Sequence, residues 1–84
     1  MIGIVISYFE RFHQLCRTLH SIEEQGGDYH IVIVDDGSSV PLELDGFEIL
    51  HMKDKDWTLQ MIALNRGIER CLGLGCEQIV TGKQ

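Results

Sequence analysis

Two adjacent carboxylates stand at the end of the most apolar stretch of the chain. Residues 31–34 are four β-branched residues in a row, and they lead directly into Asp35 and Asp36. An unbroken run of this kind predicts a strand buried on both faces, as in a parallel sheet with helices above and below. The turn residues Gly-Ser-Ser at 37–39 then end the strand. Both carboxylates therefore lie at its carboxyl end, which is the edge where open α/β sheets bind ligands.

A carboxylate at such a strand end suits a nucleotide. When ionised it only accepts hydrogen bonds, so it pairs with an imide N–H of a base or with a pair of ribose hydroxyls. Ser7 and Tyr8 end the first predicted strand and should lie beside the aspartates, where the tyrosine ring offers a stacking surface for a base. A plain structural alternative stays open for each group: two solvated acids before a turn, and a tyrosine that fills the top of the sheet.

Asn65, Arg66 and Gly67 are unusual residues for the interior of a predicted helix. A glycine in the middle of a helix costs about 1 kcal/mol relative to alanine, and sequences carry such costs where close packing or a site requires them. We expect Gly67 to mark a tight contact between the helix and the sheet. For Asn65 and Arg66, both a place in the site and simple solvation remain open.

The elements that would position these residues follow from hydrophobic periodicity. We expect strands over residues 2–7, 29–34, 47–52 and 78–81, and helices over residues 10–25 and 57–72. The expected buried helix faces carry Phe12, Leu15, Cys16, Leu19 and Ile22 on the first helix, and Met61, Leu64, Ile68, Cys71 and Leu72 on the second. This order predicts an α/β fold with a small, mainly parallel sheet of strand order 3-2-1-4. The ligand crevice would lie where the order reverses, between strands one and four.

Size and charge narrow the class of protein. Residues 1–84 make one small domain with a net charge of −6, which argues against binding to nucleic acid or to an anionic membrane surface. No apolar run approaches the roughly 20 residues of a membrane span. The three irregularly spaced cysteines predict free thiols rather than a disulfide framework, and hence a cytoplasmic protein. His13, Cys16 and His20 share no single face, so no zinc site is expected.

Three segments, in order, resemble family 2 glycosyltransferases of the GT-A fold. Residues 4–12, IVISYFERF, resemble the family's VIPTYNR pattern; residues 31–39, IVIVDDGSS, resemble IIVVDDGS; and residues 63–75, ALNRGIERCLGLG, resemble ARNxGIxxAxG. The family transfers a sugar from a nucleotide-sugar donor to an acceptor. The resemblance implies that Tyr8 packs on the donor's base and that Asp36, with Asp35 beside it, recognises the uracil or ribose. It also implies that the helix around Asn65 and Arg66 borders the diphosphate.

The chain also departs from the family pattern. Phe9 replaces the usual Asn, Ile6 the usual Pro, and Leu64 the usual Arg. The fourth strand of the family runs into an Asp-x-Asp motif that holds a divalent metal on the diphosphate, whereas residues 78–84 contain no acid. We therefore assign no catalytic or metal-binding residue, and Lys83 is a weak substitute cation. Mg or Mn would accompany the nucleotide-sugar only if the rest of the site exists.

The resemblance leaves two interpretations of the chain. The first is a truncated or minimal donor-binding half that binds a UDP-sugar and does not turn over alone. The second is a non-catalytic structural or interaction module descended from a glycosyltransferase. Such a module would act in a homo-oligomer or a larger assembly through its last strand, because an edge strand exposes unpaired backbone groups.

Overall fold

The structure is a computed structural model that describes residues 1–55 and 61–83. Its elements are β1 (Ile2–Tyr8), α1 (Phe12–Gln25), β2 (Tyr29–Asp36), β3 (Glu48–Met52), α2 (Met61–Gly73) and β4 (Gln78–Lys83). The element order confirms the prediction, although α1 begins at Phe12 rather than at residue 10. The predicted start of the second helix, at residue 57, lies outside the described residues.

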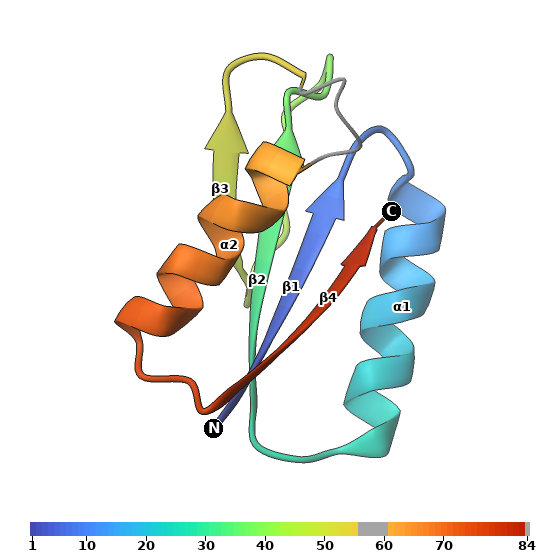
Figure 1. Ribbon diagram of the computed structural model, residues 1–84. Coiled ribbons are helices and arrows are strands. Elements are labelled where there is room, and N and C mark those ends of the chain that lie inside the picture. Colours follow the sequence, from blue (N-terminus) through green and yellow to red (C-terminus); the bar gives the residue numbers. More distant parts are fainter. Residues whose placement is uncertain (56–60, 84) are drawn as a thin grey trace.

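The four strands form one sheet in the order β3-β2-β1-β4, with every neighbouring pair parallel (Figure 1). This confirms the predicted topology. The strands run further than the apolar runs suggested, because pairing continues through polar residues: Tyr8 pairs with Asp35, and Asp36 with Met52. Both aspartates are therefore the last two residues of β2 and do not belong to the loop that follows it.

The two faces of the sheet carry separate hydrophobic cores. Val5, Val32 and Val34 pack with Ala63 and Cys71 of α2 on one face. On the other face, Ile6 and Ile33 pack with Leu15 and Leu19 of α1. Neighbouring strand residues alternate between these cores because successive side chains of a strand point to opposite faces. One helix thus covers each face, which explains why the central strands are apolar throughout.

The helix α2 lies close to the sheet because its inner stripe is made of small residues. Ala63, Gly67 and Cys71, four residues apart, are its buried positions. A Cβ atom added at Gly67 would lie 2.2 Å from Cγ1 of Val5, which confirms the expected tight contact. The predicted burial of Met61 and Leu72 was wrong: both are exposed, because the small stripe presses against the sheet and leaves these bulkier side chains outside it.

The helix α1 buries a narrower face than predicted. Leu15 and Leu19 are buried, Cys16 and Ile22 are partly buried, and Phe12 is 46% exposed at the first turn. Phe12 lies at the end of the helix, where it extends beyond the core formed by Leu15 and Leu19. All three cysteines are free thiols, as predicted. Among the described residues, no helix has the length and apolar character needed to cross a membrane.

Candidate functional site

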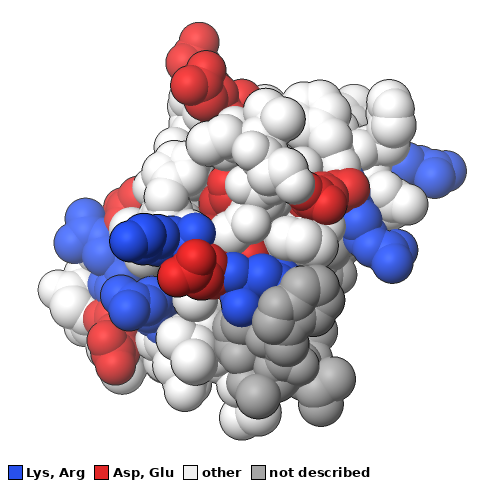
Figure 2. All heavy atoms as spheres, turned by 90° about the horizontal axis from the view of Figure 1, so that it is seen from above, with Lys and Arg blue, Asp and Glu red and all other residues white. Residues whose placement is uncertain are grey.

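The candidate site lies at the edge where β1 and β2 end. Because these strands are parallel and in register, Tyr8 stands directly beside Asp35, and the predicted side-by-side arrangement of the two strand ends is confirmed. Figure 2 looks onto this edge and shows acidic side chains near its centre and basic side chains over the side of β3 and α2. The predicted residues Ser7, Tyr8, Asp35 and Asp36 are all buried here.

The sheet divides these four residues between its two faces. Tyr8 belongs to the core on the α1 face, and Asp35 follows the alternation of that face. Ser7 precedes Tyr8 by one position and Asp36 follows Asp35 by one position, so both point to the α2 face. The Ser7 hydroxyl donates a hydrogen bond of 3.4 Å to the carbonyl of Gly82 on β4. Tyr8 and Asp36 therefore project from opposite faces of the sheet.

Asp35 organises the loop that follows β2. Its Oδ1 accepts the backbone N–H of Ser38 at 3.2 Å, and its Oδ2 accepts the backbone N–H of Leu42 at 2.8 Å. Nδ1 of His51 on β3 lies 3.5 Å from the same Oδ2. The buried carboxylate thus finds its hydrogen-bond donors within the protein, as buried polar groups must. These bonds fix the backbone of the loop after β2.

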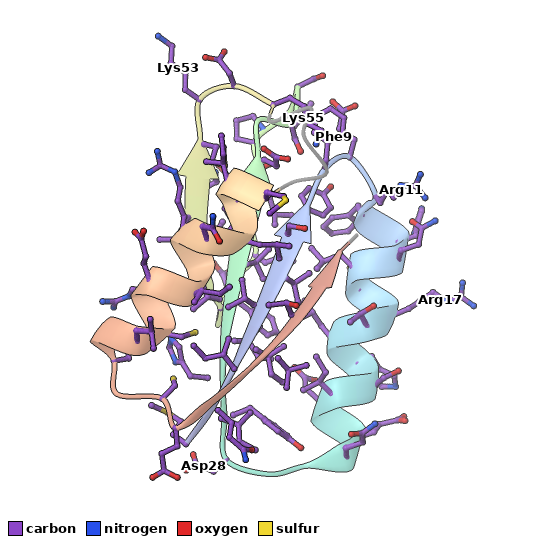
Figure 3. The ribbon with its side chains drawn as sticks, in the orientation of Figure 1. Phe9, Arg11, Arg17, Asp28, Lys53 and Lys55 are labelled. Carbon is purple, nitrogen blue, oxygen red and sulfur yellow. The ribbon has the colours of Figure 1, made fainter. Side chains whose placement is uncertain are left out.

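Asp36 is held by a lysine from the loop after β3. The Lys55 amine lies 2.7 Å from Oδ2 of the fully buried Asp36, and the lysine side chain is only 13% exposed. The same amine lies 4.9 Å from the centre of the Phe9 ring, and Figure 3 shows the two side chains meeting above the strand ends. A cation over an aromatic face is attracted by the ring's quadrupole. Lys55 therefore contacts both the last residue of β2 and the residue that follows β1.

Gly37 allows the Lys55 loop to reach the aspartate. A Cβ atom at position 37 would lie within 2.5 Å of backbone atoms of Asp54 and Lys55, so only glycine permits this approach. Its φ of +74° is also the left-handed conformation that glycine adopts without steric cost. Gly37 thus allows both the turn after β2 and the close approach of the Lys55 backbone.

A second loop closes the edge from the α1 side. Oε1 of Glu10 accepts the backbone N–H of Ser39 at 2.8 Å and also the Ser39 hydroxyl, while the backbone N–H of Glu10 donates to Oγ of Ser38 at 3.2 Å. These bonds from Ser39 lower the pKa of Glu10.

The pKa of Tyr8 is raised, mainly because the phenol is buried and to a smaller extent because of the nearby charge of Asp35. The phenol therefore stays protonated at neutral pH.

Asn65 and Arg66 lie on the exposed surface of α2. Arg66 lines an open cavity of about 450 Å³ together with His51, Lys53 and Lys55, and Asp54 is the one acid among the described residues of its lining. Arg66 is thereby brought near the Asp36–Lys55 pair, whereas no described contact brings Asn65 there.

Sequence reasoning missed Glu10, His51 and Lys55. The charged loop at residues 53–56 was a signal for Lys55, but nothing local indicated its partner 19 residues away.

The described residues do not fit a divalent metal. Within residues 1–55 and 61–83, no group of three or more His, Cys, Asp or Glu side chains could hold a metal ion. The nearest carboxylates are already used, since Asp35 accepts backbone N–H groups and Asp36 pairs with Lys55. The metal that the family resemblance implies therefore finds no set of ligands among them.

The open parallel sheet, with acids at the carboxyl edge of its central strands, is of the α/β class, in which ligands bind at that edge. The family model described as Glycosyl transferase family 2 matches residues 3–75. The chain therefore belongs to the family 2 glycosyltransferases, which confirms the resemblance seen in its three motifs. Comparisons of the chain with curated proteins and with solved structures found no match.

Proposed function

We propose that the chain is the donor-binding half of a family 2 glycosyltransferase and binds UDP or a UDP-sugar at the carboxyl edge of β1 and β2. The observation that carries this proposal is the fully buried Asp36 paired with Lys55. A buried ion pair contributes little net stability, because desolvation offsets the Coulomb attraction. Its presence at the ligand-binding edge of the sheet supports a role in binding rather than in folding alone.

In this proposal Asp36 recognises the uracil or ribose as a hydrogen-bond acceptor. Asp35, bonded to Ser38 and Leu42, holds the loop in place beside it. Stacking of the base on Tyr8 requires a rearrangement that exposes the ring, since only 5% of Tyr8 is accessible. Ser7 supports the strand end through Gly82, and Asn65 and Arg66 provide polar groups from α2.

We further propose that this chain transfers no sugar by itself. Departure of a nucleoside diphosphate develops negative charge that must be stabilised, and the described residues contain no acid cluster for a divalent ion. Binding without turnover is the expected behaviour. The three free thiols support a reducing compartment, and hence the cytoplasm, as its location.

The test is a titration of the folded chain with UDP, followed by amide chemical shifts, for the wild type and for Asp36→Asn. We expect the variant to bind at least about tenfold more weakly, since a charge-assisted hydrogen bond is roughly twice as strong as a neutral one. Asp28→Asn is the matched control, because Asp28 is an exposed acid before β2, at the opposite end of the sheet from the site (Figure 3), and should leave the affinity unchanged. Undiminished binding by Asp36→Asn would overturn the site assignment.

A second candidate function, self-association as an interaction module, is favoured by the outer edge of β4. In the described part of the chain β4 pairs only with β1. Val80 on β4 is 56% exposed, and beside it an open, largely apolar cavity of about 420 Å³ lies between β4 and α1, with Ile4, Ile6 and Ile22 in its lining. Sedimentation at micromolar concentration decides: a dimer that Val80→Lys dissociates supports this function, and a monomer contradicts it.

A further inference from the structure

We propose that the phosphate groups of the donor are bound by Lys55 and Arg66, and that the Lys55 amine exchanges the Asp36 carboxylate for a phosphate when the nucleotide enters. This inference rests on the proposed function and specifies how the same site neutralises its ligand. Protein cations would then take the place of a metal ion in binding by this chain.

The exchange follows from the burial of Asp36. Its carboxylate is fully buried against the Lys55 amine at 2.7 Å, so a nucleoside that uses Asp36 as an acceptor must compete with that amine. Separating a buried ion pair leaves an uncompensated charge, which is strongly unfavourable. A ligand with its own anionic group removes the part of this cost that falls on the amine, because the amine passes from one anion to another. A nucleoside diphosphate has both the hydrogen-bond donors for Asp36 and the anion for Lys55.

The cavity next to the Asp36–Lys55 pair is lined by positively charged side chains, which attract an anion. Of the residues of its lining that the structure describes, Lys53, Lys55 and Arg66 are basic, with His51 beside them, and Asp54 alone is acidic. The whole chain, by contrast, carries a net charge of −6. Figure 2 shows this concentration of basic side chains over β3 and α2. Arg70, further along α2, is already paired with Glu48. Within residues 1–55 and 61–83, by contrast, no carboxylate pairs with Lys53 or Arg66, so these cations are available to a ligand.

Each of the two proposed residues has a suitable chemistry and position. An arginine guanidinium binds phosphate oxygens with two parallel N–H groups, and a lysine binds them as a point charge. The Lys55 backbone is held against Gly37, while its long side chain can turn about its own bonds from Asp36 toward the cavity that it lines. A phosphate placed between Lys55 and Arg66 would thus lie within one side-chain length of Asp36.

The experiment compares uridine with UDP, both titrated in EDTA by amide chemical shifts. The two ligands share the nucleoside and differ only in the diphosphate, so the ratio of their affinities isolates the phosphate contribution. We expect wild-type protein to bind UDP at least about tenfold more tightly than uridine, since charge-assisted bonds to phosphate are the strong ones. Lys55→Gln should bring this ratio to within about threefold of unity, and Arg66→Gln should lower it. Arg17→Gln removes the same charge from the exposed face of α1, far from the cavity (Figure 3), and should leave the ratio unchanged.

The outcomes separate the inference from the proposed function. Equal affinities for uridine and UDP, or a ratio that survives Lys55→Gln, overturn the phosphate role and leave nucleoside binding intact. UDP binding that appears only on addition of Mg²⁺ also overturns it. If neither ligand binds at millimolar concentration, the proposed function fails and the inference with it. If Lys55→Gln does not fold, Arg66→Gln and salt decide: raising the ionic strength should weaken UDP binding but not uridine binding.

Discussion

Replacing Gly67 by alanine tests how closely α2 must approach the sheet. The added Cβ atom would lie 2.2 Å from Cγ1 of Val5 and 3.2 Å from Cγ2 of Val34. Carbon atoms pack at about 3.5–4.0 Å, so the helix must lift by roughly 1 Å or Val5 must leave its rotamer. Neither adjustment is small, because Val5 and Val34 are both fully buried between α2 and the sheet.

Two opposing effects set the size of the change. Overpacking of a well-packed core costs about 1–3 kcal/mol, while alanine is favoured over glycine in a helix by about 1 kcal/mol. Because the first distance is far below any normal contact, we place the packing cost near the upper end of its range. The free energy of unfolding of Gly67→Ala should therefore fall by about 2 kcal/mol.

Gly73→Ala is the matched control on the same helix. Gly73 is the last residue of α2, and a Cβ atom there would meet nothing within 4 Å. This variant should gain up to about 1 kcal/mol from helix propensity alone. Urea unfolding followed by circular dichroism measures both, and with a slope of about 1–2 kcal/mol per molar urea the two midpoints should differ by more than about 1 M. A Gly67→Ala protein as stable as Gly73→Ala would refute the close approach of α2.

Three further predictions concern the edge and its surroundings. Asp35→Ala should lower the free energy of unfolding by about 2 kcal/mol, because the buried N–H of Leu42 loses its acceptor; a loss below about 0.5 kcal/mol would contradict the role given to Asp35. The pKa of Glu48 is lowered from 4.5, mainly by the hydrogen bond from Arg70, so its stabilisation is present above pH 4.5 and lost as the pH falls through the folded-state pKa. Glu48→Gln should remove that part of the acid dependence in unfolding titrations, and an unchanged profile would count against it. Burial raises the pKa of the Cys71 thiol, so iodoacetamide followed by mass spectrometry should modify the partly buried Cys16 first, whereas early modification of Cys71 would show that α2 opens.

Much of the fold could be predicted because its determinants are local. The β-branched run before Asp35 and the two amphipathic segments are enough to indicate strands and helices, and short right-handed crossovers leave few parallel topologies. Gly67 was also predictable, because a costly residue in a helix interior signals a packing requirement. The exposure of Met61 and Phe12 was not, since periodicity gives the direction of a face but not how far the neighbouring layer extends over it.

The candidate site was less predictable because its contacts are tertiary. That Asp35 and Asp36 end a central strand follows from the sequence, but the pairing of Asp36 with Lys55 depends on where the loop after β3 returns. The burial of Tyr8 depends likewise on Leu15, Leu19 and Leu42, which meet it only in the folded core. Alternation in the pleat separates Tyr8 from Asp36, and that consequence could have been read from the sequence once the strand was taken to continue through both residues.

A donor-binding site at the carboxyl edge of β1 and β2 is tested most directly by a titration of the wild-type chain with UDP in EDTA, observed by amide chemical shifts. We expect saturable shifts that gather at Asp36, Lys55 and Arg66 and in the turn at residues 37–39, where the ion pair would open. An absence of shifts at millimolar UDP, or shifts spread evenly over the surface, would contradict a donor-binding site at this edge of the sheet.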